Sequence, residues 1–316
     1  MAPSDSATDQ HPAPALAPAL IKVKLSPVEE TMILTLWCRA RDAASAKPKG
    51  GDVYAQAILD RVDKASFGSS MFPRDSRFGD YIAVRARLLD EWCRTFLEAH
   101  AGVPVTVLHL GCGLDLRVLR VRPSCGGDVR WIDIDRPEVV NLRRRLIPDP
   151  IRPSSASGAG GEDREREWDY RLIGASVTDE SWTAQIPPDR PLLVIGEGLF
   201  PYLTPDEAAA LLRQLVERAP AGGQVLMDTV GSLMVRYQAL APLFRSTRVR
   251  MRWGVDDGED VARAHPRLRL NEALLFCDLL PGAFASGAPP FLGVLTPLFS
   301  LLPGWRTYGQ LLRLEF

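Results

Sequence analysis

Short apolar segments that alternate with helical patterns constrain the fold of this chain more than any other feature. The five expected strands are Val105–Leu110, Val129–Ile134, Asp169–Ile173, Leu192–Glu197 and Gln224–Asp228. Runs so nearly free of charge suit parallel strands, because the crossover helices of a parallel sheet cover both of its faces. We therefore predict an α/β fold built on a doubly wound parallel sheet.

Helix signals support this prediction. Thr204 has the chemistry of an N-cap residue, Pro205 stands in the first helical position, and Glu207 completes a capping box. Amphipathic helices are also expected over residues 26–40 and 81–97, where apolar residues recur at helical spacing. These helices fit between or beside the expected strands.

The chain reads as one domain, residues 21–316, behind a disordered tail at residues 1–20 that is rich in Ala, Pro and Ser. Residues 152–167 combine Gly and Ser with dense charge, which predicts a flexible insertion loop. The final segment TYGQLLRLEF, residues 307–316, alternates enough to form a last strand inserted at the edge of the sheet.

The segment VLHLGCGLDLR breaks the first expected strand with Gly111 and Gly113. In doubly wound sheets, ligands bind beyond the carboxyl ends of the strands, and the turn after the first strand lets the backbone approach the ligand. Glycine suits this turn because a side chain would occupy the ligand's space, and because positive φ angles cost glycine little. The turn therefore predicts a ligand beside Gly111 and Gly113.

The next strand ends in WIDIDRPEVV, which places Asp133 and Asp135 about 20 to 22 residues beyond Gly113. A carboxylate at this strand tip can accept hydrogen bonds from both ribose hydroxyls of an adenine nucleoside. Strand alternation turns Asp133 the other way, so Asp135 is the candidate ribose ligand. The alternative is that Asp135 only caps the helix that starts at Pro137.

The glycine turn departs from the dinucleotide-binding pattern G-x-G-x-x-G, because Leu116 occupies its third glycine position. Leu116, together with Asp115 inside the loop, disfavours a pyrophosphate and leaves room for a cofactor with an amino acid end. S-adenosylmethionine is a cofactor of that kind, and we expect it here. A NAD(P)-dependent dehydrogenase is the rival enzyme.

Charge and cysteine content exclude other classes. The formal charge is −1, from 38 basic and 39 acidic residues, so no overall field would hold nucleic acid or an anionic membrane. No apolar window reaches the roughly 20 residues of a membrane span, and no signal peptide is evident. Five widely spaced cysteines without a C-x-x-C pair argue against disulfides and zinc. We expect a cytoplasmic protein without a metal, nucleic acid or membrane partner.

Five segments, in one order over roughly residues 22–255, resemble the leucine carboxyl methyltransferase family. The resemblance is closer to its polyketide O-methyltransferase branch, typified by the tetracenomycin carboxyl methyltransferases. The segments are LSPVEETMILTLWCRARDA, YIAVRARLLDEW, VLHLGCGLDLR, WIDIDRPEVVNLRRRLI and GEGLFPYLTPDEAAALL. The resemblance implies a class I methyltransferase fold, which is Rossmann-like, with an N-terminal helical cover.

The resemblance also implies roles for residues near the nucleoside. Gly111 and Gly113 match the turn under the methionine part of S-adenosylmethionine, and Asp135 matches the ribose-binding acid. Ser176 and Val177 match the loop next to the adenine, with Asp179 as a further candidate contact. Leu116 replaces the threonine of the usual loop, Gly-x-Asp-Thr-Arg.

Three more residues match the family near the methyl group. Glu197 matches an acid near the cofactor's amino acid end; its charge has no obvious partner in the sequence, although an arginine ion pair is the alternative. Arg85 matches an arginine that holds the cofactor carboxylate, against the alternative of a solvated helix face. Tyr202 matches a tyrosine on the methyl-acceptor side and is the candidate catalytic residue; the alternative is a hydrophobic staple.

Other polar residues receive structural interpretations. The run Arg143, Arg144 and Arg145 is interpreted as a solvated, salt-bridged helix surface. His109 is expected to pack inside the sheet. The carboxy-terminal stretch from WGVDD through FLGVLTPLFSLLPGW, which is apolar and carries aromatic residues, is expected to form the acceptor pocket and a lid.

The expected reaction follows from these assignments. Methyl transfer from a sulfonium is an in-line displacement that needs alignment and exclusion of water more than a general base. The scarcity of placed histidines suits a carboxylate or an acidic phenol as acceptor. We predict an O-methyltransferase that acts on a polyketide-like small molecule, with an aromatic or polyketide acid as the expected acceptor. A protein C-terminal leucine carboxyl methyltransferase and a non-catalytic binding domain are the alternatives.

Overall fold

The fold is described from a computed structural model that places residues 20–22, 27–63, 76–122, 128–147, 169–240, 249–279 and 306–316. The predicted tail, except for residue 20, lies outside these residues, as do the predicted insertion loop at 152–167 and residues 280–305 of the predicted lid segment, whose residues 253–279 are described. Within the described residues, we find no helix with the length and apolar character needed to cross a bilayer.

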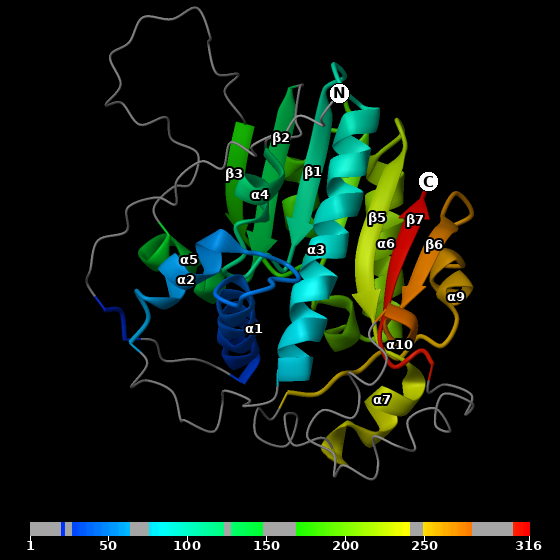
Figure 1. The fold of residues 1–316 in the computed structure, drawn as a ribbon. Coiled ribbons are helices and arrows are strands. Elements are labelled where there is room, and N and C mark those ends of the chain that lie inside the picture. The colour runs from blue at the N-terminus through cyan, green and yellow to red at the C-terminus, as the bar shows by residue number, and fades with distance from the viewer. Residues whose placement is uncertain are drawn as a thin grey trace, which may run out of the picture.

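A seven-stranded sheet in the order β3-β2-β1-β4-β5-β7-β6 forms the centre of the molecule (Figure 1). Neighbouring strands from β3 to β5 pair in parallel, which confirms the predicted doubly wound sheet. The strands are β1 (Val105–Leu110), β2 (Val129–Asp135), β3 (Asp169–Gly174), β4 (Leu192–Gly196), β5 (Gly223–Thr229), β6 (Arg269–Leu275) and β7 (Gln310–Glu315).

Helices surround this sheet and also lie beyond one of its ends. The α-helices are α1 (Pro27–Ala43), α2 (Val53–Leu59), α3 (Ser76–Ala99), α4 (Arg117–Val121), α5 (Pro137–Leu146), α6 (Pro205–Arg218), α7 (Ser232–Tyr237), α9 (Gly258–Ala262) and α10 (Phe276–Leu279). The short 3-10 helices are η4 (Glu180–Gln185), η5 (Phe200–Tyr202) and η6 (Gln238–Leu240).

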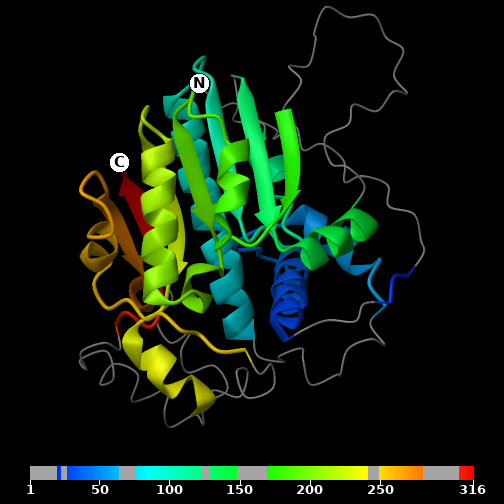
Figure 2. The ribbon, with the colours of Figure 1, turned by 180° about the vertical axis from the view of Figure 1, so that it is seen from behind.

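Two apolar layers cover the two faces of the sheet. Leu89 of α3 belongs to the cluster that includes Val107 of β1, and α3 crosses the near face in Figure 1. Leu212 of α6 belongs to the cluster that includes Leu108, and α6 lies on the opposite face, as Figure 2 shows. Successive residues of β1 thus point to opposite layers, as expected of a strand buried on both faces.

The local signals for α6 were read correctly. The Thr204 hydroxyl accepts a hydrogen bond from the backbone N–H of Glu207, and the Glu207 carboxylate accepts one from the N–H of Thr204. This reciprocal pair satisfies two backbone donors that the first turn of a helix leaves without partners. The helix therefore begins at Pro205, as predicted.

The predicted C-terminal strand is present as β7, one position in from the edge. It runs antiparallel between β5 and β6, and its Leu311, Leu312 and Leu314 are fully buried. The edge strand is β6, which the sequence analysis did not predict. β6 was not predicted because polar residues interrupt its apolar ones, and because a long segment separates it in the sequence from its neighbour β7.

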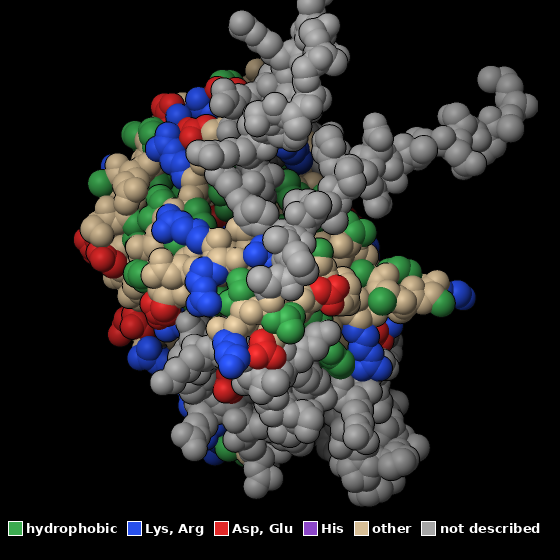
Figure 3. Space-filling view, turned by 90° about the vertical axis from the view of Figure 1, so that its left-hand side faces the viewer, with side chains coloured by type: hydrophobic (Ala, Val, Ile, Leu, Met, Phe, Trp, Pro, Cys, Tyr) green, Lys and Arg blue, Asp and Glu red, His purple; other side chains and the backbone are tan. Residues whose placement is uncertain are grey.

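Helices α1 and α2 lie beyond the carboxyl ends of β1 and β2 and form the predicted N-terminal cover (Figure 1). Their apolar faces pack against the loop that follows β1: Ile33 of α1 and Ile58 of α2 share a buried cluster with Leu114 and Leu116. The loop after β1 is therefore enclosed between the sheet and the N-terminal helices. On the face shown in Figure 3, acidic and basic side chains both occur across the described surface.

Candidate functional site

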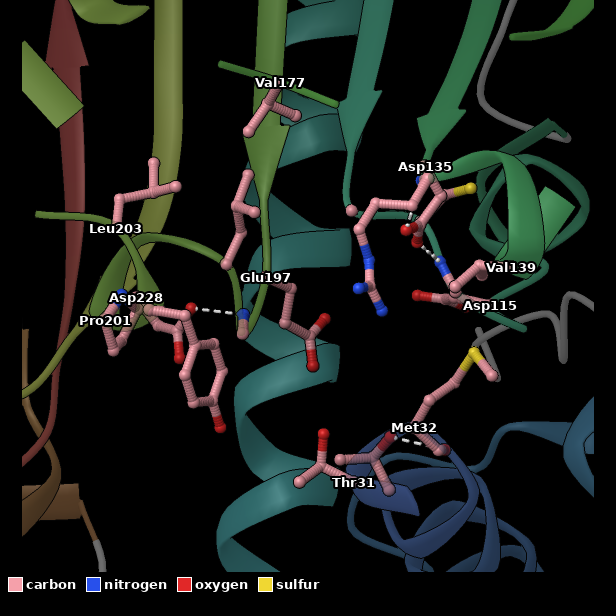
Figure 4. Close-up of a pocket in the computed structure, with 18 of the residues that line it drawn as sticks. Thr31, Met32, Asp115, Asp135, Val139, Val177, Glu197, Pro201, Leu203 and Asp228 are labelled. Carbon is pink, nitrogen blue, oxygen red and sulfur yellow. Dashed lines mark hydrogen bonds between the residues drawn. The ribbon is translucent and has the colours of Figure 1, made fainter. Parts of the chain in front are cut away.

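A cavity of about 530 Å³ lies between the carboxyl ends of the parallel strands and helices α1 and α3. The site residues predicted from the sequence line this cavity, with the exception of Asp179: Arg85, Gly111, Gly113, Asp135, Ser176, Val177, Glu197 and Tyr202. Figure 4 shows Asp135 and Glu197 at the cavity; Asp135 ends β2 and Glu197 follows β4, the two strands that flank β1. The volume of the cavity falls within the usual range for small-molecule sites.

The glycine turn has the backbone conformation that its sequence predicted. Gly111 has a φ of 64° and Gly113 a φ of 52°, both in the left-handed region that strains other residues. A Cβ atom on Gly113 would lie 3.2 Å from the Cγ and Sδ atoms of Met32, and one on Gly111 would lie 3.4 Å from Leu199. Met32 and Leu199 both line the cavity, so a larger residue would press on the cavity wall.

Asp135 joins the end of β2 to this turn. One of its carboxylate oxygens accepts a hydrogen bond from the Gly113 N–H at 2.7 Å, and the other accepts one from the Arg136 N–H at 2.8 Å. Burial raises the pKa of Asp135, and the two backbone donors oppose this rise. A carboxylate has about four acceptor sites, so these two bonds leave capacity toward the cavity that Asp135 lines.

Asp133 and Asp135 are two residues apart in β2, so alternation places them on the same face of the strand, and the predicted reason for choosing Asp135 was wrong. Asp135 stands at the end of the strand and lines the cavity, whereas Asp133 lies one step deeper, is fully buried and is fully engaged. Its Oδ1 accepts from the Trp131 indole at 2.7 Å, and its Oδ2 accepts from Tyr170 at 2.9 Å and from Arg143 at 2.7 Å. Burial would raise the pKa of Asp133, but the Arg143 guanidinium and the other donors outweigh it and lower the pKa. Asp133 thus links side chains from β2, β3 and α5 inside the structure.

His109 packs inside the sheet, as expected, and connects two charged groups. Its Nε2 lies 3.3 Å from Arg117 Nη1, and its Nδ1 lies 3.3 Å from Asp133 Oδ1. Because a guanidinium can only donate, Nε2 must be the acceptor, which places the ring proton on Nδ1 facing Asp133.

The interpretation of Arg143 as a solvated residue was wrong. Arg143 is fully buried, whereas Arg144 and Arg145 are exposed. Its guanidinium donates to the carbonyl oxygens of Gly113 and Asp115 and to the carboxylate of Asp133. Helical periodicity carried the missing signal, because position 143 shares a face with Val139 and Val140 and with Leu146, all of which are buried.

The expectation that Glu197 has no obvious protein partner was also wrong. Its carboxylate pairs with Arg85 at 3.1 Å and with Arg117, while Arg85 also pairs with Asp228 at 2.7 Å. Burial would raise the pKa of Glu197, but the guanidinium groups of Arg117 and Arg85 outweigh it and lower the pKa to about 2. The alternative of an arginine ion pair is therefore present, although Glu197 and Arg85 still line the cavity.

Asp228, at the end of β5, has the opposite balance. Its carboxylate accepts from Arg85 and from the Gly198 N–H at 2.6 Å. Burial raises its pKa, and these donors do not cancel the rise. The sequence analysis did not single out Asp228, although it ends an expected strand beside Glu197 and lines the cavity.

The N-terminal cover is tied to the glycine loop by charge. Asp115 in that loop pairs with Arg39 of α1 at 2.8 Å and with Arg120 of α4 at 2.6 Å. Burial would raise the pKa of Asp115, but Arg120, Arg39 and Arg117 hold it well below its usual value. Asp115 therefore fixes the loop to its surroundings, a role that local sequence does not reveal because Arg39 is distant in the chain.

The loop after β3 carries three residues that were predicted to contact the cofactor, and two of them line the cavity. Ser176 and Val177 line the cavity, with Val177 buried and Ser176 partly exposed. Asp179 does not belong to the lining; its carboxylate instead accepts from the Ser181 N–H at 2.9 Å and caps η4. The expectation of an additional contact from Asp179 thus gains no support from the geometry.

A further part of the lining is apolar and aromatic. Phe78 and Tyr81, one helical turn apart on α3, stack with their ring centroids 6.4 Å apart. Tyr202 lies in η5, and burial raises the pKa of its phenol to about 12. Met251 also contributes to this lining. Together these side chains give the cavity a region suited to an apolar or aromatic ligand.

Comparisons with known proteins agree with this architecture. The model of the leucine carboxyl methyltransferase family matches residues 35–216. The tetracenomycin polyketide synthesis O-methyltransferase TcmP of Streptomyces glaucescens is 34% identical over 93% of this chain and 98% of its own length. The S-adenosyl-L-methionine-dependent methyltransferase dpfgK of Gibberella zeae is also 34% identical, over 80% of this chain and 84% of its own.

A solved structure supports the fold at lower sequence similarity. The crystal structure of a DUF574 family protein from Streptomyces avermitilis aligns with a TM-score of 0.52 at 11% identity, covering 88% of this chain and 96% of that one. The family match covers more than half of the chain, and both relatives above are more than 30% identical to it. The chain belongs to the leucine carboxyl methyltransferase family.

Proposed function

We propose that this protein is an S-adenosylmethionine-dependent O-methyltransferase that methylates a carboxylate or phenolic hydroxyl of a polyketide-like small molecule in the cytoplasm. The observation that carries the proposal is that the glycine turn, Asp135 and Glu197, from the ends of β1, β2 and β4, line one cavity. Relatives named as methyltransferases of this kind support it.

The lining fits the nucleoside end of S-adenosylmethionine. Asp135 retains acceptor capacity for ribose hydroxyls, and its raised pKa shows that its carboxylate lacks full compensation for burial. Val139 and Val177 both line the cavity and offer apolar contact to a flat base. Ser176 adds a hydroxyl to the lining.

The lining also fits the amino acid end. Glu197 and Asp228 present carboxylates to an ammonium, and Arg85 presents a guanidinium to a carboxylate. Arg85 already holds both acids, so the cofactor would join an existing ion-pair network. Such a network positions the charges before the ligand arrives, which lowers the cost of ordering them.

Bound S-adenosylmethionine would supply an electrophilic methyl group on a sulfonium. The chain's own residues would orient the acceptor oxygen and exclude water. Tyr202, with its pKa near 12, remains protonated at neutral pH and can donate a hydrogen bond to that oxygen. His109 also lines the cavity, but its two ring nitrogens lie 3.3 Å from Arg117 and from Asp133, so they face protein groups rather than an acceptor proton. An acceptor that is already ionised suits this arrangement.

The aromatic part of the lining favours a small aromatic acid as acceptor. Phe78, Tyr81 and Tyr202 all line the cavity, so an acceptor bound there would meet aromatic side chains. A peptide ending in leucine is the second acceptor class, because the family includes enzymes of that kind by its description. Nucleic acid is not part of the proposal. The dehydrogenase alternative is disfavoured because Leu116 occupies the third glycine position of the dinucleotide-binding pattern. In the structure Leu116 is buried against α1 and α2, directly before the short helix α4.

The test is methyl transfer from isotope-labelled S-adenosylmethionine to a panel of aromatic polyketide acids, the matching phenols and a peptide ending in leucine. We expect label in a small aromatic acid or phenol, and a base-labile product would identify a methyl ester. Asp135→Asn should abolish most turnover at limiting cofactor. Asp179→Asn is the matched control, because asparagine keeps the η4 cap outside the cavity. Transfer only to the peptide would overturn the proposed substrate class.

A further inference from the structure

We propose that Arg143 is a positioning residue for cofactor binding: it fixes the backbone of Gly113, and through it Asp135, in the geometry that receives the ribose. This inference rests on the proposed function, because it assumes that Asp135 binds the ribose hydroxyls. It assigns a role to a side chain that is buried beneath the glycine turn and is not part of the cavity lining.

The Arg143 guanidinium bridges three groups of the loop and the sheet. Nη1 donates to the carbonyl oxygens of Gly113 at 2.8 Å and Asp115 at 2.7 Å, and Nη2 donates to Asp133 at 2.7 Å. The two carbonyls are two residues apart in the loop, whose own backbone bond runs from the Asp115 N–H to the Cys112 carbonyl. The planar guanidinium of Arg143 thus ties the two ends of this short loop segment to each other and to Asp133.

Gly113 is therefore held from two sides. Its N–H donates to the Asp135 carboxylate, and its carbonyl accepts from Arg143. A shift of Gly113 would lengthen the bond to Asp135 or turn that carboxylate away from its present position. The orientation of Asp135 toward the cavity thus depends on the loop that Arg143 secures.

Arg143 is itself held in one place by the sheet. Its partner Asp133 also accepts from Trp131 and Tyr170 and faces His109. Because Trp131, Tyr170 and Arg143 all donate to this one carboxylate, a displacement of Asp133 would leave several buried polar groups without partners. The support beneath the glycine turn is therefore rigid, which is what precise placement of Asp135 requires.

A lysine could not reproduce this arrangement. Its single ammonium can stay beside Asp133, but it lacks the fork that reaches two carbonyls and a carboxylate at once. Arg143→Lys should therefore keep the buried charge paired, and with it the fold, while loosening the loop. Arg143→Met removes both the pairing and the bridge.

The experiment compares two ligands by calorimetric titration: S-adenosylhomocysteine and its 2′,3′-dideoxy analogue. The wild-type protein should prefer the ligand with hydroxyls by about tenfold or more, as expected for hydrogen bonds to a charged group. Arg143→Lys should lose most of that preference and bind the dideoxy analogue with nearly wild-type affinity. In turnover assays, its KM for the cofactor should rise more than its kcat falls.

Arg145→Met is the matched control, since Arg145 lies on the exposed side of the same helix. This variant should keep the wild-type preference. A folded Arg143→Lys protein that keeps the full preference would overturn the inference, as would an equal loss of affinity for both ligands. Asp135→Asn separates the two proposals: if it also keeps the preference, the ribose contact itself is wrong, whereas loss in Asp135→Asn alone refutes only the role of Arg143.

Discussion

Gly113→Ala tests whether the glycine turn lies against a ligand or only makes a tight turn. At a φ of 52°, alanine would carry left-handed strain of about 1–2 kcal/mol. The reduced entropy of the unfolded chain offsets about 0.4–1 kcal/mol of that strain. The net loss of stability should therefore lie between about 0 and 1.6 kcal/mol, which leaves the protein folded.

The effect on the cavity should be larger than this backbone strain. The new Cβ would lie 3.2 Å from Met32, so the Met32 side chain must move, and Met32 lines the cavity. The Gly113 N–H that Asp135 accepts would also shift. A displaced Asp135 would lose a hydrogen bond from a ribose hydroxyl of the ligand. The loss of one such bond to a charged group costs roughly 1.5–3 kcal/mol, or about 10- to 150-fold in affinity for S-adenosylhomocysteine.

Gly102→Ala provides the matched control. Gly102 has a φ of 83°, and a Cβ there meets no atom within 4 Å, so the substitution carries backbone strain without touching the cavity. The assays are thermal unfolding for stability and calorimetric titration with S-adenosylhomocysteine for affinity. We expect similar stability losses in both variants but weakened binding only in Gly113→Ala. Equal affinity in both variants would refute the placement of the ligand beside the turn.

Further predictions follow from the buried charges and the sheet. As the pH is lowered, affinity for S-adenosylhomocysteine should begin to fall before the pH reaches 3.8, the ordinary pKa of an aspartate. The reason is that burial raises the pKa of Asp135 and that ribose hydroxyls donate to its ionised form. Titrations of Asp135→Asn across the same pH range should show a smaller change. Glu197→Gln should destabilise the protein at neutral pH by about 3 kcal/mol in denaturant unfolding, since it breaks a buried ion pair. Because the folded pKa of Glu197 is about 2 and the ordinary value is 4.5, its stabilisation is present above pH 4.5 and is lost as the pH falls toward 2, so the variant's stability should vary less over that interval. Tyr202→Phe should lower kcat less than tenfold, roughly the value of one hydrogen bond, and a loss of several hundredfold would show that the phenol does more than orient the acceptor. Truncation before Gln310 should leave the protein insoluble or unfolded, because it removes the buried leucines of β7; a soluble product with an unchanged melting temperature would contradict the sheet order.

Much of the sheet was predictable because its signals are local. Parallel strands buried on both faces require short apolar runs, and β1 to β5 carry them within a residue or two of the predicted bounds. The strand tips were predictable for the same reason: once β1 and β2 are placed, Gly113 and Asp135 must meet at one edge of the sheet. Asp135 differs from Asp133 by its place at the end of the strand, because alternation puts residues two apart on the same face.

The errors concern partners that are distant in the sequence. Glu197 finds Arg85, 112 residues away, and Asp115 finds Arg39 on the N-terminal cover. No local pattern announces such pairs, because each depends on how helices α1 and α3 lie over the sheet. Arginine runs mislead for a related reason: Arg143 differs from its two neighbours only by the helix face that it shares with buried valines.

The most direct test of the account is thermal unfolding of the wild-type protein with S-adenosylhomocysteine, NAD and NADP in parallel. A ligand present at 100 times its dissociation constant adds about 2.7 kcal/mol of stability, which raises the melting temperature measurably. The account predicts a rise with S-adenosylhomocysteine and none with either nicotinamide cofactor. A rise with NAD or NADP and none with S-adenosylhomocysteine would contradict it.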